Sequence, residues 1–127
     1  MKAYLAGPMR SRPGFNFAAF DSAAAVLREQ GHEIISPAEM DRALGFEGLT
    51  ASESDFAALG GLPAAMRRDL AALLEVEAIV LLPGWQHSEG TKIELFFAQT
   101  LGIPAYVFVN DQALEAHGTQ QRIVRCS

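Results

Sequence analysis

The sequence has little cysteine, little histidine and no long apolar run, and each shortage excludes a class of protein. A single cysteine, Cys126, cannot form an internal disulfide, which suits the reducing cytoplasm. The histidines lack metal-ligand spacing, and no Gly-rich nucleotide loop or nucleophile elbow is present, so we expect no metal and no cofactor. No run approaches the roughly 18 apolar residues of a membrane span, and Gly7-Pro8 ends the first apolar stretch before a signal-peptide core could form. The sequence therefore predicts a cytoplasmic protein without a membrane partner.

Positive charge is also scarce. Ten Lys and Arg stand against fifteen Asp and Glu, which gives a formal net charge of −5. A binder of polymeric nucleic acid needs a basic surface to displace counterions, so we expect no such partner, although a local pocket for one small anion stays open. Half of the 127 residues are hydrophobic, which is enough to build a core. This length fits one domain over residues 1–127.

Short apolar runs alternate with segments of helical periodicity along most of the chain. We expect strands at 2–6, 32–35, 78–82 and 104–109, and helices at 15–30, 63–75 and 88–101. Residues 38–62 are less regular and contain one short helix near 53–59; such long excursions often form a lid or part of a binding site. Residues 111–117 are expected as a last helix, and Ile123-Val124 as a weak edge strand.

This alternation predicts an α/β three-layer sandwich with four or five parallel strands. In such sheets a ligand binds beyond the carboxyl ends of the strands. Three segments then share one rim: Gly7–Gly14, Ser36–Asp41 and Pro83–Gly90. We therefore look for the residues that carry chemistry on these segments and on the helices beside them.

The segment that runs from Gly84 to Glu94 follows a buried strand and opens a helix, so its free backbone N–H groups can attract an anion. Ser88 is the natural N-cap of this helix. Gly90 and Glu94 share one helix face, and the missing Cβ of Gly90 lets a ligand approach the Glu94 carboxylate. A carboxylate early in a helix is held ionised by the helix dipole, which suits a nucleophile. The simpler alternative is a capping serine and a surface glutamate that compensates the dipole.

Asp69 lies at the edge of the apolar stripe of the helix at 63–75. An unpaired buried carboxylate is costly, and desolvation raises its pKa. A raised pKa is what a general acid needs near neutral pH. The alternative interpretation is a structural salt bridge from Asp69 to Arg67, Arg68 or another basic residue.

The first strand and the turn after it carry a third group of candidates. Tyr4 lies in the strand that enters the rim and could hydrogen-bond a carboxylate, while Gly7 permits close backbone approach. Arg10 is a fixed cation suited to a phosphate, and Phe15 and Phe17 could stack on a flat ring. The alternatives are a core aromatic at Tyr4, a solvated Arg10 and ordinary helix packing for the two phenylalanines.

Together these segments resemble the nucleoside 2-deoxyribosyltransferase superfamily, and within it a small branch of unassigned function found in phages and bacteria. The matching pieces are Tyr4-Leu5-Ala6-Gly7-Pro8-Met9-Arg10, Phe15-Asn16-Phe17, Arg68-Asp69-Leu70 and Ser88-Glu89-Gly90-Thr91-Lys92-Ile93-Glu94-Leu95. The resemblance implies a flavodoxin-like, Rossmann-like fold and cleavage of an N-glycosidic bond. It also implies that Glu94 is the catalytic nucleophile, Asp69 the general acid and Tyr4 the residue that positions the nucleophile.

Ser88 distinguishes two branches of this superfamily. The transferases, which use free nucleosides, have an acid at the matching position, whereas the nucleotide hydrolases have a serine. An acid would repel a phosphate, but a serine hydroxyl at a helix N-terminus binds one. Arg10 likewise resembles the phosphate-binding arginine of the hydrolases. The resemblance therefore favours hydrolysis of a (deoxy)nucleoside 5′-monophosphate through a glycosyl ester on Glu94.

The remaining expected substrate contacts are Gly7, Met9 and Gly90 and, at the base, Phe15, Asn16 and Phe17. Two other functions stay open: base exchange between free deoxynucleosides, and nucleotide binding without catalysis. Members of the superfamily are commonly dimers or larger, and Phe96-Phe97 is an apolar pair suited to a subunit interface. We therefore expect a homodimer or larger homo-oligomer whose other partner is a small nucleotide or nucleoside.

Overall fold

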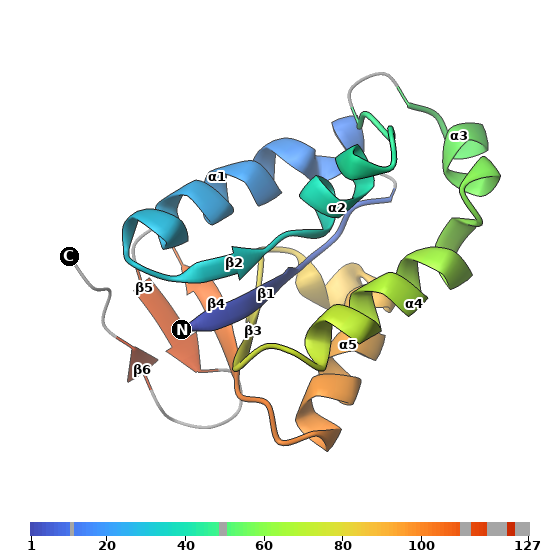
Figure 1. Cartoon of the computed structure of the whole chain (residues 1–127). Coiled ribbons are helices and arrows are strands. Elements are labelled where there is room, and N and C mark those ends of the chain that lie inside the picture. Colours follow the sequence, from blue (N-terminus) through green and yellow to red (C-terminus); the bar gives the residue numbers. More distant parts are fainter. Residues whose placement is uncertain (11, 49–50, 110–112, 117–121, 124–127) are drawn as a thin grey trace.

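Six strands and five helices are described in the computed structural model, which covers residues 1–10, 12–48, 51–109, 113–116 and 122–123 (Figure 1). The strands are β1 (Lys2–Ala6), β2 (Glu33–Ile35), β3 (Ala78–Leu81), β4 (Ala105–Val109), β5 (Ala113–Ala116) and β6 (Arg122–Ile123). The helices are α1 (Phe17–Glu29), α2 (Pro37–Ala43), α3 (Glu53–Ala58), α4 (Gly61–Leu73) and α5 (Glu89–Thr100), with 3-10 turns η1 (Pro13–Asn16) and η2 (Trp85–His87). The strands and long helices expected before residue 110 are confirmed, with shifts of a few residues at their ends.

The sheet has the strand order β2-β1-β3-β4-β5-β6, with β1 and β3 flanked on both sides. β1 to β4 run parallel, as predicted, in a register that pairs Tyr4 with Ile79 and Val80 with Tyr106. Every residue of β3 is buried, which explains its uninterrupted apolar sequence. Helices cover both faces, so the protein is the expected α/β three-layer sandwich of the flavodoxin-like, Rossmann-like class.

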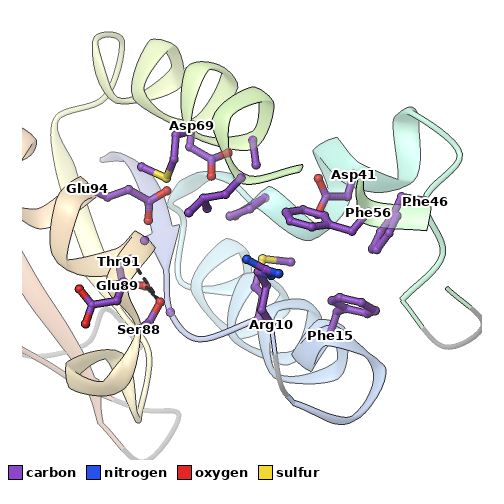
Figure 2. A pocket seen from close by; sticks show the side chains of 17 residues that line it. Arg10, Phe15, Asp41, Phe46, Phe56, Asp69, Ser88, Glu89, Thr91 and Glu94 are labelled. Atoms are coloured by element: carbon purple, nitrogen blue, oxygen red, sulfur yellow. Dashed lines mark hydrogen bonds between the residues drawn. The ribbon is translucent and has the colours of Figure 1, made fainter. Parts of the chain in front are cut away.

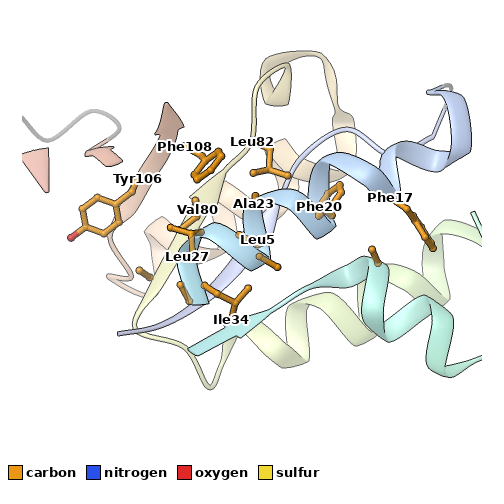
Figure 3. Packing of buried hydrophobic residues seen from close by; sticks show 14 of the residues in the cluster. Leu5, Phe17, Phe20, Ala23, Leu27, Ile34, Val80, Leu82, Tyr106 and Phe108 are labelled. Atoms are coloured by element: carbon orange, nitrogen blue, oxygen red, sulfur yellow. The ribbon is translucent and has the colours of Figure 1, made fainter. Parts of the chain in front are cut away.

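Side chains of β1 alternate between the two faces of the sheet and so belong to two separate cores. Leu5 packs on the face covered by α1, where Phe20 and Leu27 are fully buried (Figure 3). Burial of one such side chain contributes about 2 kcal/mol to folding. Tyr4 packs on the opposite face, in the cluster that holds Leu73 of α4. The alternation therefore turns the Tyr4 side chain toward the layer formed by α4 and α5.

The expectation of irregular chain after β2 is wrong for α2. Pro37 ends β2, but it also occupies the first turn of α2, where its missing N–H removes no hydrogen bond. Glu39 in the first turn and Arg42 in the last turn complement the helix dipole. Arg28 of α1 donates to Glu39 at 2.6 Å and ties the two helices together. A proline that stops one element can thus begin the next.

The last part of the sheet also differs from the expectation. Residues 113–116, predicted within a helix, form β5, which runs antiparallel to β4 and pairs Leu114 with Phe108. Without β5 the backbone of β4 would be unpaired at one edge, and pairing outweighs the helix propensity of so short a segment. β6 follows as an antiparallel edge strand that includes Ile123, as predicted. Other residues of these predictions lie outside the described part: Asp111, Gln112, His117, Val124 and Cys126.

The expected short helix is present as α3, and a capping box begins it. The Ser52 side chain accepts the Asp55 backbone N–H, and the Asp55 carboxylate accepts the Ser52 backbone N–H. α3 lies away from the sheet, next to the start of α4 (Figure 1). Across the described residues, no helix combines the length and apolar character that a membrane crossing requires.

Candidate active site

A cavity opens where the three predicted rim segments meet, beyond the carboxyl ends of the parallel strands (Figure 2). The loop after β1, the start of α2 and the start of α5 each contribute to its wall, and α4 closes the remaining side. Among the described residues, those that line the cavity include five with ionisable side chains: Arg10, Asp41, Asp69, Glu89 and Glu94. The place where parallel sheets bind ligands is therefore hollow and charged.

Tyr4 and Glu94 form a buried hydrogen bond at one end of the cavity. The Tyr4 hydroxyl donates to Glu94 Oε2 at 2.8 Å, and the two residues are 0% and 5% exposed. β1 directs Tyr4 toward α5, and Glu94 lies one turn after Gly90 on the face of α5 that lines the cavity. This burial excludes the alternative of a surface glutamate, and the hydrogen bond gives Tyr4 a polar contact beyond core packing.

Asp69 lines the same cavity from α4. Figure 2 shows its side chain across from Glu94. The alternative of a salt bridge from Asp69 to its neighbours is not what the structure shows, because Arg68 pairs with Asp41 at 3.0 Å and Arg67 is exposed. In the part of the chain that is described, no ion pair neutralises Asp69.

Burial is the main cause that raises the pKa of both Glu94 and Asp69. The Asp69 charge raises the pKa of Glu94 further, whereas the Tyr4 hydrogen bond lowers it. Burial also raises the pKa of Tyr4 well above its ordinary value, so the hydroxyl stays a neutral donor. The Tyr4 hydrogen bond and the Arg68 charge also lower the pKa of Asp69, and because the two carboxyls interact, their titration belongs to the pair.

Ser88 begins α5 at the wall of the cavity. Its Oγ accepts the Thr91 backbone N–H at 3.2 Å and the Thr91 hydroxyl at 2.9 Å. Because both contacts use Ser88 as an acceptor, its own O–H proton is left to donate to a ligand. Glu89 also lines the cavity and adds a negative charge beside this donor.

Arg10 lies on another part of the cavity wall. Its guanidinium donates to Glu53 of α3 at 2.6 Å and lies over the Phe56 ring, 5.0 Å from the ring centroid. The two charged side chains are 49% and 58% exposed, and exposed pairs of this kind contribute about 0–1 kcal/mol. An anionic ligand can therefore compete with Glu53 for Arg10.

Three phenylalanines form an apolar wall at the end of the cavity away from Glu94. Phe46 packs against Phe15 with ring centroids 5.0 Å apart and against Phe56 at 6.0 Å. Phe15 and Asn16 have φ of 53° and 61°, a left-handed backbone that side chains other than glycine rarely adopt. Such strained backbone is often found at ligand-binding sites, and the wall suits a flat aromatic ring.

The structure does not bring all the predicted base contacts together. Phe15 lines the cavity, but Asn16 and Phe17 are absent from its described lining. The Asn16 amide donates to the Pro8 carbonyl at 2.8 Å, and Phe17 packs in the core on the α1 side of the sheet. Phe17 therefore contacts the wall from the core side, with its ring centroid 6.2 Å from that of Phe46, and Asn16 holds the loop after β1.

The glycines expected in the site do line it, together with Met9. A Cβ on Gly7 would lie 2.9 Å from Leu82 Cβ, so tight packing against Leu82, directly after β3, favours a glycine there. A Cβ on Gly90 would lie 3.7 Å from Met66 Sδ, which is an ordinary contact across the gap between α4 and α5. The packing of α4 against α5 therefore does not require a glycine at position 90.

Other lining residues were not singled out by the sequence analysis, among them Asp41, Phe46 and Phe56. Asp41 ends one of the three predicted rim segments, which is a weak signal for it. Phe46 and Phe56 lie in the excursion at 38–62, whose only signal was its length. Among the described residues, no three His, Cys, Asp or Glu side chains are grouped as metal ligands would be.

Comparison with known proteins agrees with this geometry. A family model described as a domain of unknown function (DUF4406) matches residues 1–107. Among solved structures, the chain is similar to a 2-deoxyribosyltransferase from the psychrotolerant bacterium Bacillus psychrosaccharolyticus, with a TM-score of 0.60 and 25% identity, covering 84% of this chain and 71% of that one. No curated protein matches the sequence. The chain belongs to the DUF4406 family, within the nucleoside 2-deoxyribosyltransferase-like superfamily.

Proposed function

We propose that this protein breaks the N-glycosidic bond of a nucleoside or nucleotide, with Glu94 as the nucleophile and Asp69 as the general acid. The observation that carries the proposal is the cluster of Tyr4, Asp69 and Glu94 at one end of one cavity. The similarity to a solved 2-deoxyribosyltransferase supports a nucleoside-type substrate.

The arrangement of the cluster suits a double displacement. Glu94 attacks the anomeric carbon of the pentose while the bond to the base breaks, through an oxocarbenium-like transition state. Asp69 gives its proton to the departing base, which leaves neutral, and the sugar remains as an ester on Glu94. Water then attacks the anomeric carbon of this ester and gives a proton to the Asp69 carboxylate, which restores both carboxyls. Tyr4 holds Glu94 Oε2 and so orients the other oxygen for attack.

For the substrate we propose a (deoxy)nucleoside 5′-monophosphate. The first turn of α5 offers free backbone N–H groups and the Ser88 hydroxyl, all donors that suit a phosphate. Arg10 supplies a cation on the same cavity, and its carboxylate partner Glu53 is exposed. The pentose would then lie between this phosphate site and the pair of Asp69 and Glu94.

A second candidate is base transfer between free nucleosides. Glu89 lines the cavity next to Ser88, and Glu53 already neutralises Arg10, so the phosphate site carries more negative charge than phosphate binding favours. In a transferase a second base takes the place of water, and Asp69 accepts the proton of that base. The similar solved structure is itself a transferase.

Base release from a substrate panel tests these candidates. The panel holds nucleoside 5′-monophosphates, the matching nucleosides, and nucleosides with a second free base, and chromatography measures free base and new nucleoside. We expect free base from monophosphates, loss of release in Glu94→Gln, and release retained in the control Glu89→Gln, which neutralises the other carboxyl at the start of α5.

Two outcomes would contradict the hydrolase. Base exchange that needs no phosphate would assign the transferase. No base release at all, with nucleotides still raising the melting temperature of wild type and Glu94→Gln alike, would assign a nucleotide-binding module without catalysis.

We also propose that two or more copies associate through the outer face of α5. Phe96 is 73% exposed on this helix, and Ile93 is 47% exposed one turn before it. Isolated exposed apolar side chains are common, but neighbours on one helix face suit an interface. Light scattering of the purified chain measures its mass in solution, and Phe96→Lys is expected to reduce it to that of the monomer. A cytoplasmic location and the lack of a cofactor stay predictions from the sequence.

A further inference from the structure

Asp41 is a carboxylate of the cavity that the proposed reaction does not use. It lies on α2, is 9% exposed and lines the cavity together with Phe46 and Phe56. Arg68 Nη2 donates to Asp41 Oδ1 at 3.0 Å, and within the described residues no hydrogen bond reaches Oδ2. Arg68 is not among the described residues that line the cavity, so its hydrogen bond leaves the cavity side of Asp41 free. One carboxylate oxygen is thus positioned and the other is available to a ligand.

The proposed reaction determines which part of a substrate would lie next to Asp41 Oδ2. Figure 2 shows Asp41 on the far side of Asp69 from Glu94, close to Phe56. The pentose must touch Glu94, and the base must lie next to Asp69 in order to receive its proton. A base in that position extends away from Glu94, so its faces meet the phenylalanine wall and its outer edge meets Asp41.

We propose that Asp41 selects the leaving base, and that it favours a base with an exocyclic amino group over the corresponding oxo base. This inference rests on the proposed function, because it takes the position of the base from the roles of Glu94 and Asp69. The preferred bases are then of the adenine and cytosine type, and the disfavoured counterparts are hypoxanthine and uracil.

The preference follows from what a carboxylate can and cannot do. An ionised carboxylate only accepts hydrogen bonds, and an amino group placed opposite it offers N–H donors. An oxo group in the same place presents an acceptor to an acceptor, which leaves both groups unpaired in a partly dehydrated site. Sites built to pair with a polar group reject analogues that lack it more strongly than apolar pockets reject a change of size.

The charge state of Asp41 agrees with an acceptor role. Burial raises the pKa of Asp41 to about 6, while the Arg68 charge opposes this rise and the Asp69 charge adds to it. Asp41 is therefore mostly ionised at pH 7 to 8. Arg68 acts as a positioning residue, since it fixes one oxygen and favours the negative charge.

A purely structural role is the ordinary alternative, because the Asp41–Arg68 pair also joins α2 to α4. The same helix offers a matched control in Glu39, whose pair with Arg28 joins α2 to α1 and which is not part of the described lining of the cavity. If Asp41 only joins α2 to α4, then Asp41→Asn and Glu39→Gln should each change the stability of the fold and leave the preference between bases unchanged. If Asp41 selects the base, only the first variant changes the preference between bases.

The test measures base preference in two independent ways on the full chain. Initial rates of base release compare adenine with hypoxanthine and cytosine with uracil, as deoxynucleoside 5′-monophosphates. Calorimetry measures the binding of free adenine and free hypoxanthine, which needs no catalysis. In the wild type we expect the amino base to be favoured by about tenfold or more in both measurements, the fold-change that a hydrogen bond to a charged group gives. Asp41→Asn, whose amide also donates, should reduce this ratio to near one or invert it, and Glu39→Gln should leave it unchanged.

The two measurements separate failure of the inference from failure of the function. Equal preference, an oxo preference, or a ratio that survives Asp41→Asn overturns the inference even if base is released. Absence of base release from every substrate overturns the proposed function, while the binding ratio of the free bases still decides the role of Asp41; failure to bind adenine up to its solubility limit counts against that role. Circular dichroism checks folding, and Asp41→Ser replaces Asp41→Asn if the amide variant does not fold.

Discussion

The two ends of the cavity are built from different kinds of structure. Tyr4, Asp69 and Glu94 come from β1, α4 and α5, regular elements with one face in the core. Phe46 and Phe56 come from the chain after α2 and from the six-residue helix α3, which lies away from the sheet. The first end holds the buried Glu94 and the half-buried Asp69, and the second holds rings and an exposed ion pair. The proposed chemistry thus lies on regular elements, and the proposed base contacts lie on shorter segments, although Phe46 also packs in the core.

This comparison predicts that changes at the carboxyl end affect the chemical step and that changes at the aromatic end affect binding. The largest effect is expected for Glu94→Gln, which removes the nucleophile and should lower kcat by about 10⁴-fold or more. Phe56→Leu, at the other end, should lower kcat by less than about tenfold and act mainly on KM. Steady-state rates of base release measure kcat and KM for both variants. Similar losses of kcat in the two variants would contradict the proposed difference between the two ends of the cavity.

Asp69→Asn is expected to lower kcat by about 10²- to 10⁴-fold, the usual contribution of a general acid. Because burial raises the pKa of Asp69, the wild-type rate should fall as pH rises through that raised pKa and the acid loses its proton. The asparagine variant should lack this alkaline fall, and a substrate whose base leaves without protonation should regain most of its rate. A pH–rate profile with an unchanged alkaline limb in Asp69→Asn would remove Asp69 from this role.

Tyr4→Phe should have a smaller effect, about 10- to 100-fold on kcat, since it removes one hydrogen bond to Glu94 and keeps the ring in the core. The Tyr4 donor lowers the pKa of Glu94, so its loss raises that pKa. The acidic limb of the pH–rate profile should therefore move to higher pH, because the nucleophile must be ionised. A drop in kcat without this movement would indicate that Tyr4 only fills space.

The smallest effect is expected at the exposed ion pair of the aromatic end. Glu53→Gln frees Arg10 from a partner that is 58% exposed, so it should lower KM for a nucleoside monophosphate by about fivefold at most and leave kcat unchanged. KM for the matching free nucleoside should not change, which serves as the internal control. A change of kcat, or equal changes for nucleotide and nucleoside, would mean that Arg10 does not contact the phosphate.

The difference between the two ends of the cavity also explains which site residues could be predicted from the sequence. Tyr4, Asp69 and Glu94 lie on elements whose apolar periodicity fixes which face is buried, so their neighbourhood follows from the parallel order of the strands. The hydrogen bond between Tyr4 and Glu94 joins residues 90 positions apart, and it was expected from the resemblance to the superfamily rather than from any local pattern.

The parts that the sequence did not predict depend on contacts without a local pattern. Asp41 was not predicted because a proline in the position of Pro37 is typical both of the end of a strand and of the start of a helix, and here it is both. The pair of Arg10 and Glu53 links two segments through exposed side chains, for which no periodicity exists. The β4–β5 pairing likewise arises from an unpaired strand edge rather than from the preference of residues 113–116.

Rapid acid quench during turnover, followed by mass spectrometry of the intact chain and of its peptides, tests the central role of Glu94 most directly. The account predicts a fraction of chains heavier by one pentose phosphate, with the added mass on the peptide that contains Glu94 and absent from Glu94→Gln. Turnover with no modified chain at any quench time, under conditions in which ester hydrolysis is slowed, or modification of another carboxyl, would contradict it.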